Sequence, residues 1–225
     1  MSIALFPDNL DIETVVIVAG GSSICGGPAW RQDKYLTDII DLLDSDPQAV
    51  LFDCNGYLSS RRTADLEEMP NPKFGFAVDF GIEPHRIPLD AVVQRFLSLP
   101  NSWQVSWSAR CAKDRAEHLG LTPQFIFGSN IRADALESQE AFQALVLDDP
   151  KAVYVEAGTL GLAITAIPGA ARTVHIYGMD SLTLNSFSNL NHDDNLCEQT
   201  YTQSRAMIWR VLQYLKDRHK FCFHA

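Results

Sequence analysis

Gly158, Thr159 and Gly161 are the residues of this chain whose types and spacing best suit the binding of an anion. They stand where a short apolar helix is expected to begin, and a helix start carries unpaired backbone N–H groups and the positive end of the helix dipole. Glycine has no side chain to keep an anion away from those N–H groups, so the turn predicts a phosphate site. A plain helix–strand connection, whose small residues serve packing alone, fits the same short motif.

Small or polar residues also follow several of the expected strands. These strand-end residues are Gly20, Gly21, Ser22, Ser23, Asn55, Asp79, Gly178 and Asp180. Ligands of an open parallel sheet lie beyond the carboxyl ends of its strands, so this repetition predicts a ligand site at that edge.

Two of these turns have a structural interpretation beside the functional one. The run 20–23 is neither a dinucleotide fingerprint nor a P-loop. It can donate N–H and hydroxyl groups to a phosphate or ribose, or it can be a tight turn. The amide of Asn55 can hold a phosphate oxygen or a base edge, or it can be a turn residue before Gly56.

His192 lies in a polar segment with Asp193 and Asp194, just before an expected long helix. Histidine is the usual general base near neutral pH, and neighbouring carboxylates favour a raised pKa and orient the ring. A metal site built from the same His and Asp side chains is a second interpretation. A solvated loop, with Asp194 or Asn195 as a helix cap, is the third. No G-x-S-x-G motif indicates a serine nucleophile.

The elements that must position these residues alternate between short apolar strands and amphipathic helices. Strands are expected at 15–19, 49–53, 73–79, 103–107, 124–127 and 174–178, with 220–224 as a candidate last strand. Helices are expected at 30–43, 89–97, 109–119, 133–147 and 195–219. This alternation is typical of a single α/β domain over residues 1–225, with a mostly parallel sheet and helices on both faces. The polar stretches 59–72 and 181–195 are expected to be mobile loops.

Composition excludes some classes of partner. The chain has 225 residues, a net charge of −10 and a pI of about 4.9, which argue against a nucleic-acid surface and against anionic lipid. Its five cysteines show no metal or redox spacing and are expected to be free thiols in a reducing compartment. Neither a signal peptide nor an apolar run of the ~20 residues of a membrane span is evident. A cytoplasmic protein without an integral membrane segment is expected.

Taken in order, the strand-end segments resemble the motifs of sialyltransferases. The segments 15–24 and 51–55 are similar to the first motif of that family, an apolar strand with a Gly/Ser turn and a later strand ending in Arg-x-Asn. The segments 158–164 and 174–180 are similar to the second, which ends in Tyr-Gly-Phe/Met/Ile-Asp. His192 falls where these enzymes carry their catalytic histidine. Residues 60 to 150 are largely unmatched.

The resemblance implies a Rossmann-like glycosyltransferase that uses a CMP-activated sugar, without a cofactor or metal. The donor would carry sialic acid or a related keto-sugar acid such as Kdo, and the acceptor would be a hydroxyl of a glycan or glycolipid. His192 would take the acceptor proton during inverting displacement. The Gly158 turn would hold the phosphate or carboxylate of the donor, and 20–23 with Asn55 would contact the cytidylate. Asp79 would stand where bacterial members place an Asn.

The chain departs from the family pattern at several positions. Asp53 replaces the Arg of Arg-x-Asn, and Ser181 begins the segment where bacterial members carry tyrosines that assist the leaving phosphate. The candidates to stabilise that phosphate are therefore Ser181, Thr183, Ser186 and Ser188. One alternative is a Mg²⁺-dependent pterin diphosphokinase-like enzyme with Asp180, Asp193 and Asp194 as its carboxylate cluster. The other is a nucleotide-binding module without catalysis.

Overall fold

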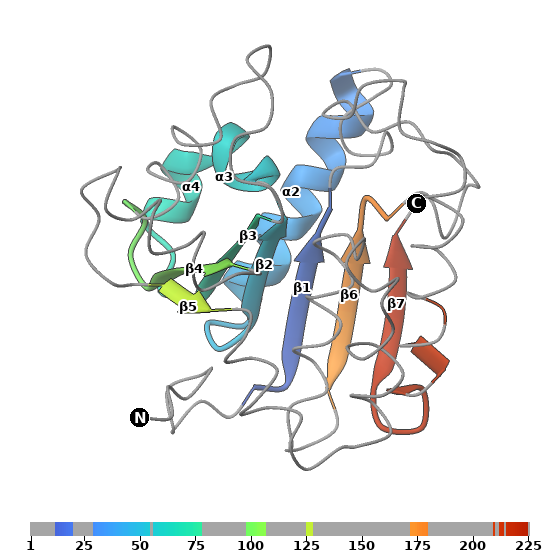
Figure 1. Cartoon of the computed structure of the whole chain (residues 1–225). Coiled ribbons are helices and arrows are strands. Elements are labelled where there is room, and N and C mark those ends of the chain that lie inside the picture. Colours follow the sequence, from blue (N-terminus) through green and yellow to red (C-terminus); the bar gives the residue numbers. More distant parts are fainter. Residues whose placement is uncertain are drawn as a thin grey trace, which may run out of the picture.

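Seven strands form one sheet in the computed structural model (Figure 1). The structure describes residues 12–19, 29–54, 56–77, 98–106, 125–127, 172–179, 209, 212–213 and 215–224. The strands are β1 (Thr14–Val18), β2 (Val50–Cys54), β3 (Lys73–Ala77), β4 (Ser102–Ser106), β5 (Phe125–Phe127), β6 (Thr173–Tyr177) and β7 (Lys220–His224). Each strand pairs in parallel with its neighbours, which confirms the α/β prediction.

The strand order is β5-β4-β3-β2-β1-β6-β7. From β1 the chain proceeds outward through β2 to β5, and it then returns to the other side of β1 to add β6 and β7. The order therefore reverses between β1 and β6. In their registers Val16 lies opposite Leu51 on one side and opposite His175 on the other.

The two central strands are apolar because the protein covers both of their faces. In β1, Val16, Ile17 and Val18 are fully buried, and so are Val50 to Phe52 in β2. Strands of a parallel sheet that are buried on both faces are expected to be continuous apolar runs rather than alternating ones. The strands predicted at 15–19 and 49–53 are confirmed, and 220–224 is indeed the last strand.

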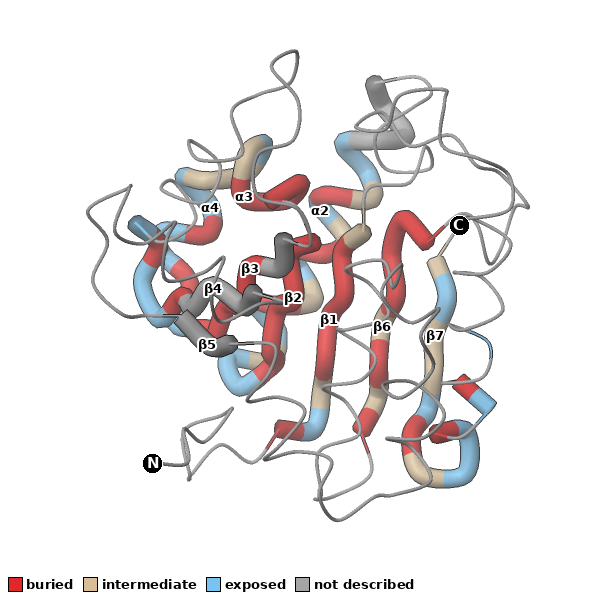
Figure 2. Tube along the Cα trace, in the orientation of Figure 1, coloured by how far each residue is buried: buried red, intermediate tan, exposed pale blue. Residues whose placement is uncertain are grey.

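Among the described residues, the helices α2 (Ala29–Ser45), α3 (Tyr57–Arg61) and α4 (Thr63–Glu67) lie on one face of the sheet. Leu36, Ile39 and Leu43 of α2 join Val16 and Val18 of β1 in one buried cluster. Figure 2 shows that β1 is buried along most of its length. On the opposite face, the exposed ring of Trp209 lies 6.5 Å from that of Phe223 in β7. Helical residues Leu212 and Leu215 near it are buried.

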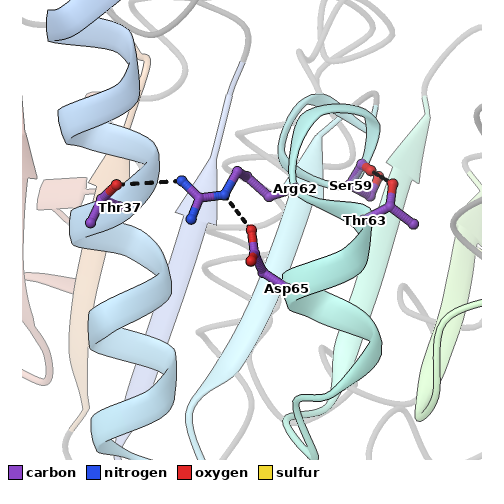
Figure 3. Close-up of polar contacts among 5 residues, drawn as sticks. All are labelled: Thr37, Ser59, Arg62, Thr63 and Asp65. Carbon is purple, nitrogen blue, oxygen red and sulfur yellow. Dashed lines mark hydrogen bonds and ion pairs between the residues drawn. The ribbon is translucent and has the colours of Figure 1, made fainter.

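The prediction of a mobile loop at 59–72 is wrong. This stretch includes most of α3 and all of α4, and Leu58 and Leu66 bury fully against the core. Arg62, between the two helices, donates to Asp65 of α4 and to Thr37 of α2 at 3.4 Å (Figure 3). These helices are too short to show a period in the sequence, and they are held by packing and by polar contacts.

The long helix predicted to reach His219 ends earlier. The described helical residues stop at Leu215, whose carbonyl oxygen accepts hydrogen bonds from the N–H groups of Arg218 and His219. The helices predicted at 89–97, 109–119 and 133–147 and the loop at 181–195 lie outside the described residues. Where the structure describes helices, none combines the length and apolar character needed to cross a membrane. Cys54 and Cys222 are free thiols.

Two buried polar side chains hold the amino-terminal edge of the sheet together. The Lys73 ammonium donates to the carbonyls of Met69 (2.7 Å), Asn71 (2.9 Å) and Pro100 (3.1 Å). Burial lowers the pKa of Lys73 to about 8, so the group stays mostly protonated at neutral pH. The Asn71 amide donates to three carbonyls, those of Leu43, Asp46 and Ala49. Lys73 and Asn71 thus use their side-chain donors on backbone carbonyls of the protein itself. Their role at this edge is therefore structural.

Candidate functional site

The carboxyl ends of β1 and β6 lie side by side where the strand order reverses. Val18 is opposite Tyr177, and the N–H of Ala19 donates to the Tyr177 carbonyl at 2.8 Å, which extends the pairing past the end of β1. On the other side of β1, Val18 is opposite Asp53 of β2. In open α/β sheets, this reversal opens a crevice beyond the strand ends, where ligands bind.

Gly178 makes the corner that follows β6. Its φ is 71°, in the left-handed region, and Gly178 and Met179 are both buried. A Cβ at this φ would cost about 1–2 kcal/mol, so the corner favours glycine. Gly178 is the one residue of the predicted site that the structure describes, and it lies at the predicted edge.

The other predicted site residues lie outside the described residues. They are Gly20, Gly21, Ser22, Ser23, Asn55, Asp79, Gly158, Thr159, Gly161, Asp180, Ser181 and His192. Three of them, Gly20, Asn55 and Asp180, are the next residues in the chain after Ala19, Cys54 and Met179. Those three described neighbours all lie at the carboxyl edge of the sheet, at the ends of three adjacent strands.

Asp53, near the end of β2, shapes the turn that contains Asn55. Its carboxylate is fully buried and accepts hydrogen bonds from the N–H groups of Leu58 (2.9 Å) and Ser59 (2.8 Å) in α3. Gly56 takes a left-handed conformation with φ 68°, which lets the chain enter α3 within reach of the carboxylate. Asp53 thus satisfies N–H groups of the first turn of α3, as a capping residue would.

Burial raises the pKa of Asp53 to about 6, and the hydrogen bonds to its carboxylate partly oppose that shift. The N–H groups that an external anion would need at the start of α3 are already bonded to Asp53. The departure from Arg-x-Asn therefore has a local reason, since the position supports the turn instead of presenting a cation. Sequence reasoning missed this role, although an Asp shortly before Asn-Gly is a signal for it.

Two histidines and a tyrosine meet at the carboxyl ends of β6 and β7. The Nδ1 atom of His175 and the Nε2 atom of His224 are 3.0 Å apart, within hydrogen-bond distance. The His224 ring stacks on Tyr177, with ring centroids 4.1 Å apart and an interplanar angle of 6°. Tyr177 belongs to the buried cluster under α2. Sequence reasoning missed this group because it depends on the adjacency of two strands far apart in the chain.

Both imidazoles are held in the neutral form at physiological pH. Burial and the charges of His224 and Lys220 lower the pKa of His175. Burial and Lys34 lower the pKa of His224, while Asp38 partly opposes them. Burial raises the pKa of Tyr177 to about 12, so its hydroxyl stays protonated. A neutral imidazole has one nitrogen that can accept a proton.

No group of three or more His, Cys, Asp or Glu side chains is arranged to hold a metal ion among the described residues. Comparison of the chain with protein-family models finds no match, and comparisons with curated proteins and with solved structures find none either. The functional interpretation therefore depends on the sequence motifs and on the geometry of this edge.

Proposed function

We propose that this protein is a Rossmann-like, inverting glycosyltransferase of the sialyltransferase type. It would transfer sialic acid or a related keto-sugar acid such as Kdo from a CMP-sugar to a hydroxyl of a glycan or glycolipid. The observation that supports this proposal is the adjacency of β1 and β6. The segments that resemble the two family motifs are distant in sequence, yet the strands that carry them pair in register at the reversal of strand order.

The proposed reaction is a direct displacement. The acceptor hydroxyl oxygen attacks the anomeric carbon of the donor, the bond from that carbon to the phosphate oxygen breaks, and CMP leaves. An imidazole accepts the hydroxyl proton, and the resemblance assigns this role to His192. The Gly158 turn and the run 20–23 would hold the cytidylate and the donor's anionic groups. The Asp53 carboxylate would support the turn between Cys54 and Gly56 through its hydrogen bonds to the start of α3.

Ligand binding tests the donor class. A ligand that binds only the folded state raises its stability by RT ln(1 + [L]/Kd), about 2.7 kcal/mol at a hundredfold excess over Kd. We expect CMP to raise the melting temperature without Mg²⁺, and ATP to have no effect. Stabilisation by ATP that requires Mg²⁺, with none by CMP, would contradict the proposal and favour the pterin diphosphokinase-like alternative.

Turnover tests the reaction class. We expect CMP release from a CMP-sugar in the presence of glycan acceptors, measured by chromatography. Addition of EDTA should leave the rate unchanged, because the proposed mechanism uses no metal. CMP binding without turnover across a panel of CMP-sugars and acceptors would instead indicate a nucleotide-binding module.

A further inference from the structure

The imidazole of His224 belongs to β7, which is the next strand after β6, and the strand order reverses between β1 and β6. His224 ends β7, and its ring stacks on Tyr177, the last residue of β6 and the neighbour of Gly178. Adjacent strands are about 4.8 Å apart, so His224 lies one strand spacing from the corner that follows β6. His224 therefore lies at the same carboxyl edge as the proposed ligand site, one strand farther from β1 than Tyr177.

The contact with His175 can fix the tautomer of His224. The two nitrogens at 3.0 Å are Nδ1 of His175 and Nε2 of His224. In the tautomer where His224 Nε2–H donates to His175 Nδ1, the lone pair of His224 lies on Nδ1. Protonation there leaves the Nε2–H bond to His175 in place, and that bond becomes charge-assisted. The pair thus has the base-plus-orienting-group arrangement of a general base.

Burial lowers the pKa of His224, and the charges around the ring act in opposite directions. From α2, Lys34 lowers and Asp38 raises the pKa of His224, and the two side chains are themselves paired at 2.5 Å. On β6 the neighbouring groups are His175 and Tyr177, and on β7 they are Lys220 and Cys222. His224 is half-buried, so part of the residue remains accessible to solvent.

We propose that His224 is the general base of the transfer reaction and that His175 is its positioning residue. The inference rests on the proposed function, and it gives His224 the role that the sequence predicts for His192. As the acceptor oxygen bonds to the anomeric carbon, its proton passes to Nδ1 of His224. The bond from that carbon to the CMP oxygen breaks, and the electron pair leaves with CMP.

The decisive variant is His224→Gln. Glutamine places an amide near the position of Nε2, so it can keep the hydrogen bond to His175 while it removes the basic nitrogen. We expect kcat of His224→Gln to fall by about 10²- to 10⁴-fold, the usual contribution of a general base. The Kd for CMP should stay unchanged.

The role of His175 is tested by its effect on the pH profile. His175→Ala removes the orienting hydrogen bond and should lower kcat by roughly two- to tenfold at unchanged KM. It should also move the acid limb of the kcat profile, since that limb reports the protonation of His224. His175→Asn, whose side-chain oxygen lies near the position of Nδ1, should restore most of the rate.

Each outcome decides the assignment. Wild-type turnover together with full turnover of His224→Gln would overturn it and leave the proposed function standing. If His224→Gln loses turnover, the His175→Ala profile decides, because an unmoved acid limb contradicts a role for His224. A wild-type protein without turnover of any CMP-sugar would refute the proposed function and the assignment together.

Discussion

At the scale of single residues, Asp53 shows how a buried charge can serve a turn. In the described part of the chain, N–H groups of α3, and not a cation, hold its carboxylate. Such an arrangement stabilises the turn only while the backbone donors stay aligned. The same residue interrupts the Arg-x-Asn pattern, so a departure from a family motif here has an architectural cause.

Replacement of Asp53 by alanine should destabilise the protein. The N–H groups of Leu58 and Ser59 would lose their buried acceptors, at a cost of about 1–3 kcal/mol in unfolding free energy. Urea unfolding measures this change. The control is Asp65→Ala. The Asp65 side chain lies on the exposed side of α4, so loss of its surface ion pair with Arg62 should cost less than about 1 kcal/mol. Equal losses in the two variants would contradict the capping role.

The contribution of Asp53 to stability should depend on pH. Its pKa is raised from 3.8 to about 6 on folding, so its contribution is fully present below 3.8 and is lost as pH rises through about 6. The difference in unfolding free energy between wild type and Asp53→Ala should therefore narrow between these values and stay constant above them. If that difference instead widens with pH, the hydrogen bonds from backbone N–H groups lower the pKa of Asp53 by more than burial raises it.

At the scale of elements, Asn71 joins the end of α2 to the start of β2. Its amide donates to the carbonyl of Leu43 in the last turn of α2, and to the carbonyls of Asp46 and Ala49, which follow the helix. One short side chain thereby sets where α2 stops and where the chain re-enters the sheet. The end of α2 in turn determines how Leu36, Ile39 and Leu43 meet β1.

Asn71→Ala should weaken this connection. We expect a loss of about 1–3 kcal/mol, because buried carbonyls lose their donor. Hydrogen exchange should accelerate first in the last turn of α2. Ser45→Ala is the matched control, since Ser45 donates to the Leu42 carbonyl from an exposed position. Exchange that accelerates equally in both variants would show that Asn71 does not hold the helix end.

At the scale of the whole molecule, the two edges of the sheet have separate tasks. Lys73 and Asn71 secure the amino edge, while the ends of β1 and β6 form the proposed ligand edge. Lys73→Met should lower the melting temperature and leave the Kd for CMP unchanged. Gly178→Ala, which puts a Cβ at a φ of 71°, should weaken CMP binding as well. Calorimetric titration separates the two effects, and equal changes in Kd would contradict this division.

Sequence patterns predicted the strands and α2 because burial on both faces gives a continuous apolar run, and burial of one helical stripe gives apolar residues at helical spacing. They failed at 59–72, where α3 and α4 are too short for a period and depend on Asp53, Leu58 and Leu66. They also missed the pair of His175 and His224, since nothing local indicates that β6 and β7 are neighbours. Of the predicted site residues, only Gly178 lies among the described residues, and the site itself stays a prediction.

The strand order has a consequence for how the chain acquires its structure. From β1 to β5 each strand pairs with the next one synthesised, whereas Thr14 of β1 must wait for Thr173 of β6. Contacts between such distant segments form slowly, because a long loop must close before they stabilise anything. A ribosome-bound chain that ends before β6 would therefore expose the backbone N–H and C=O groups of β1 that later pair with β6. Until β6 emerges, this edge of β1 can bind chaperones or pair with a wrong strand.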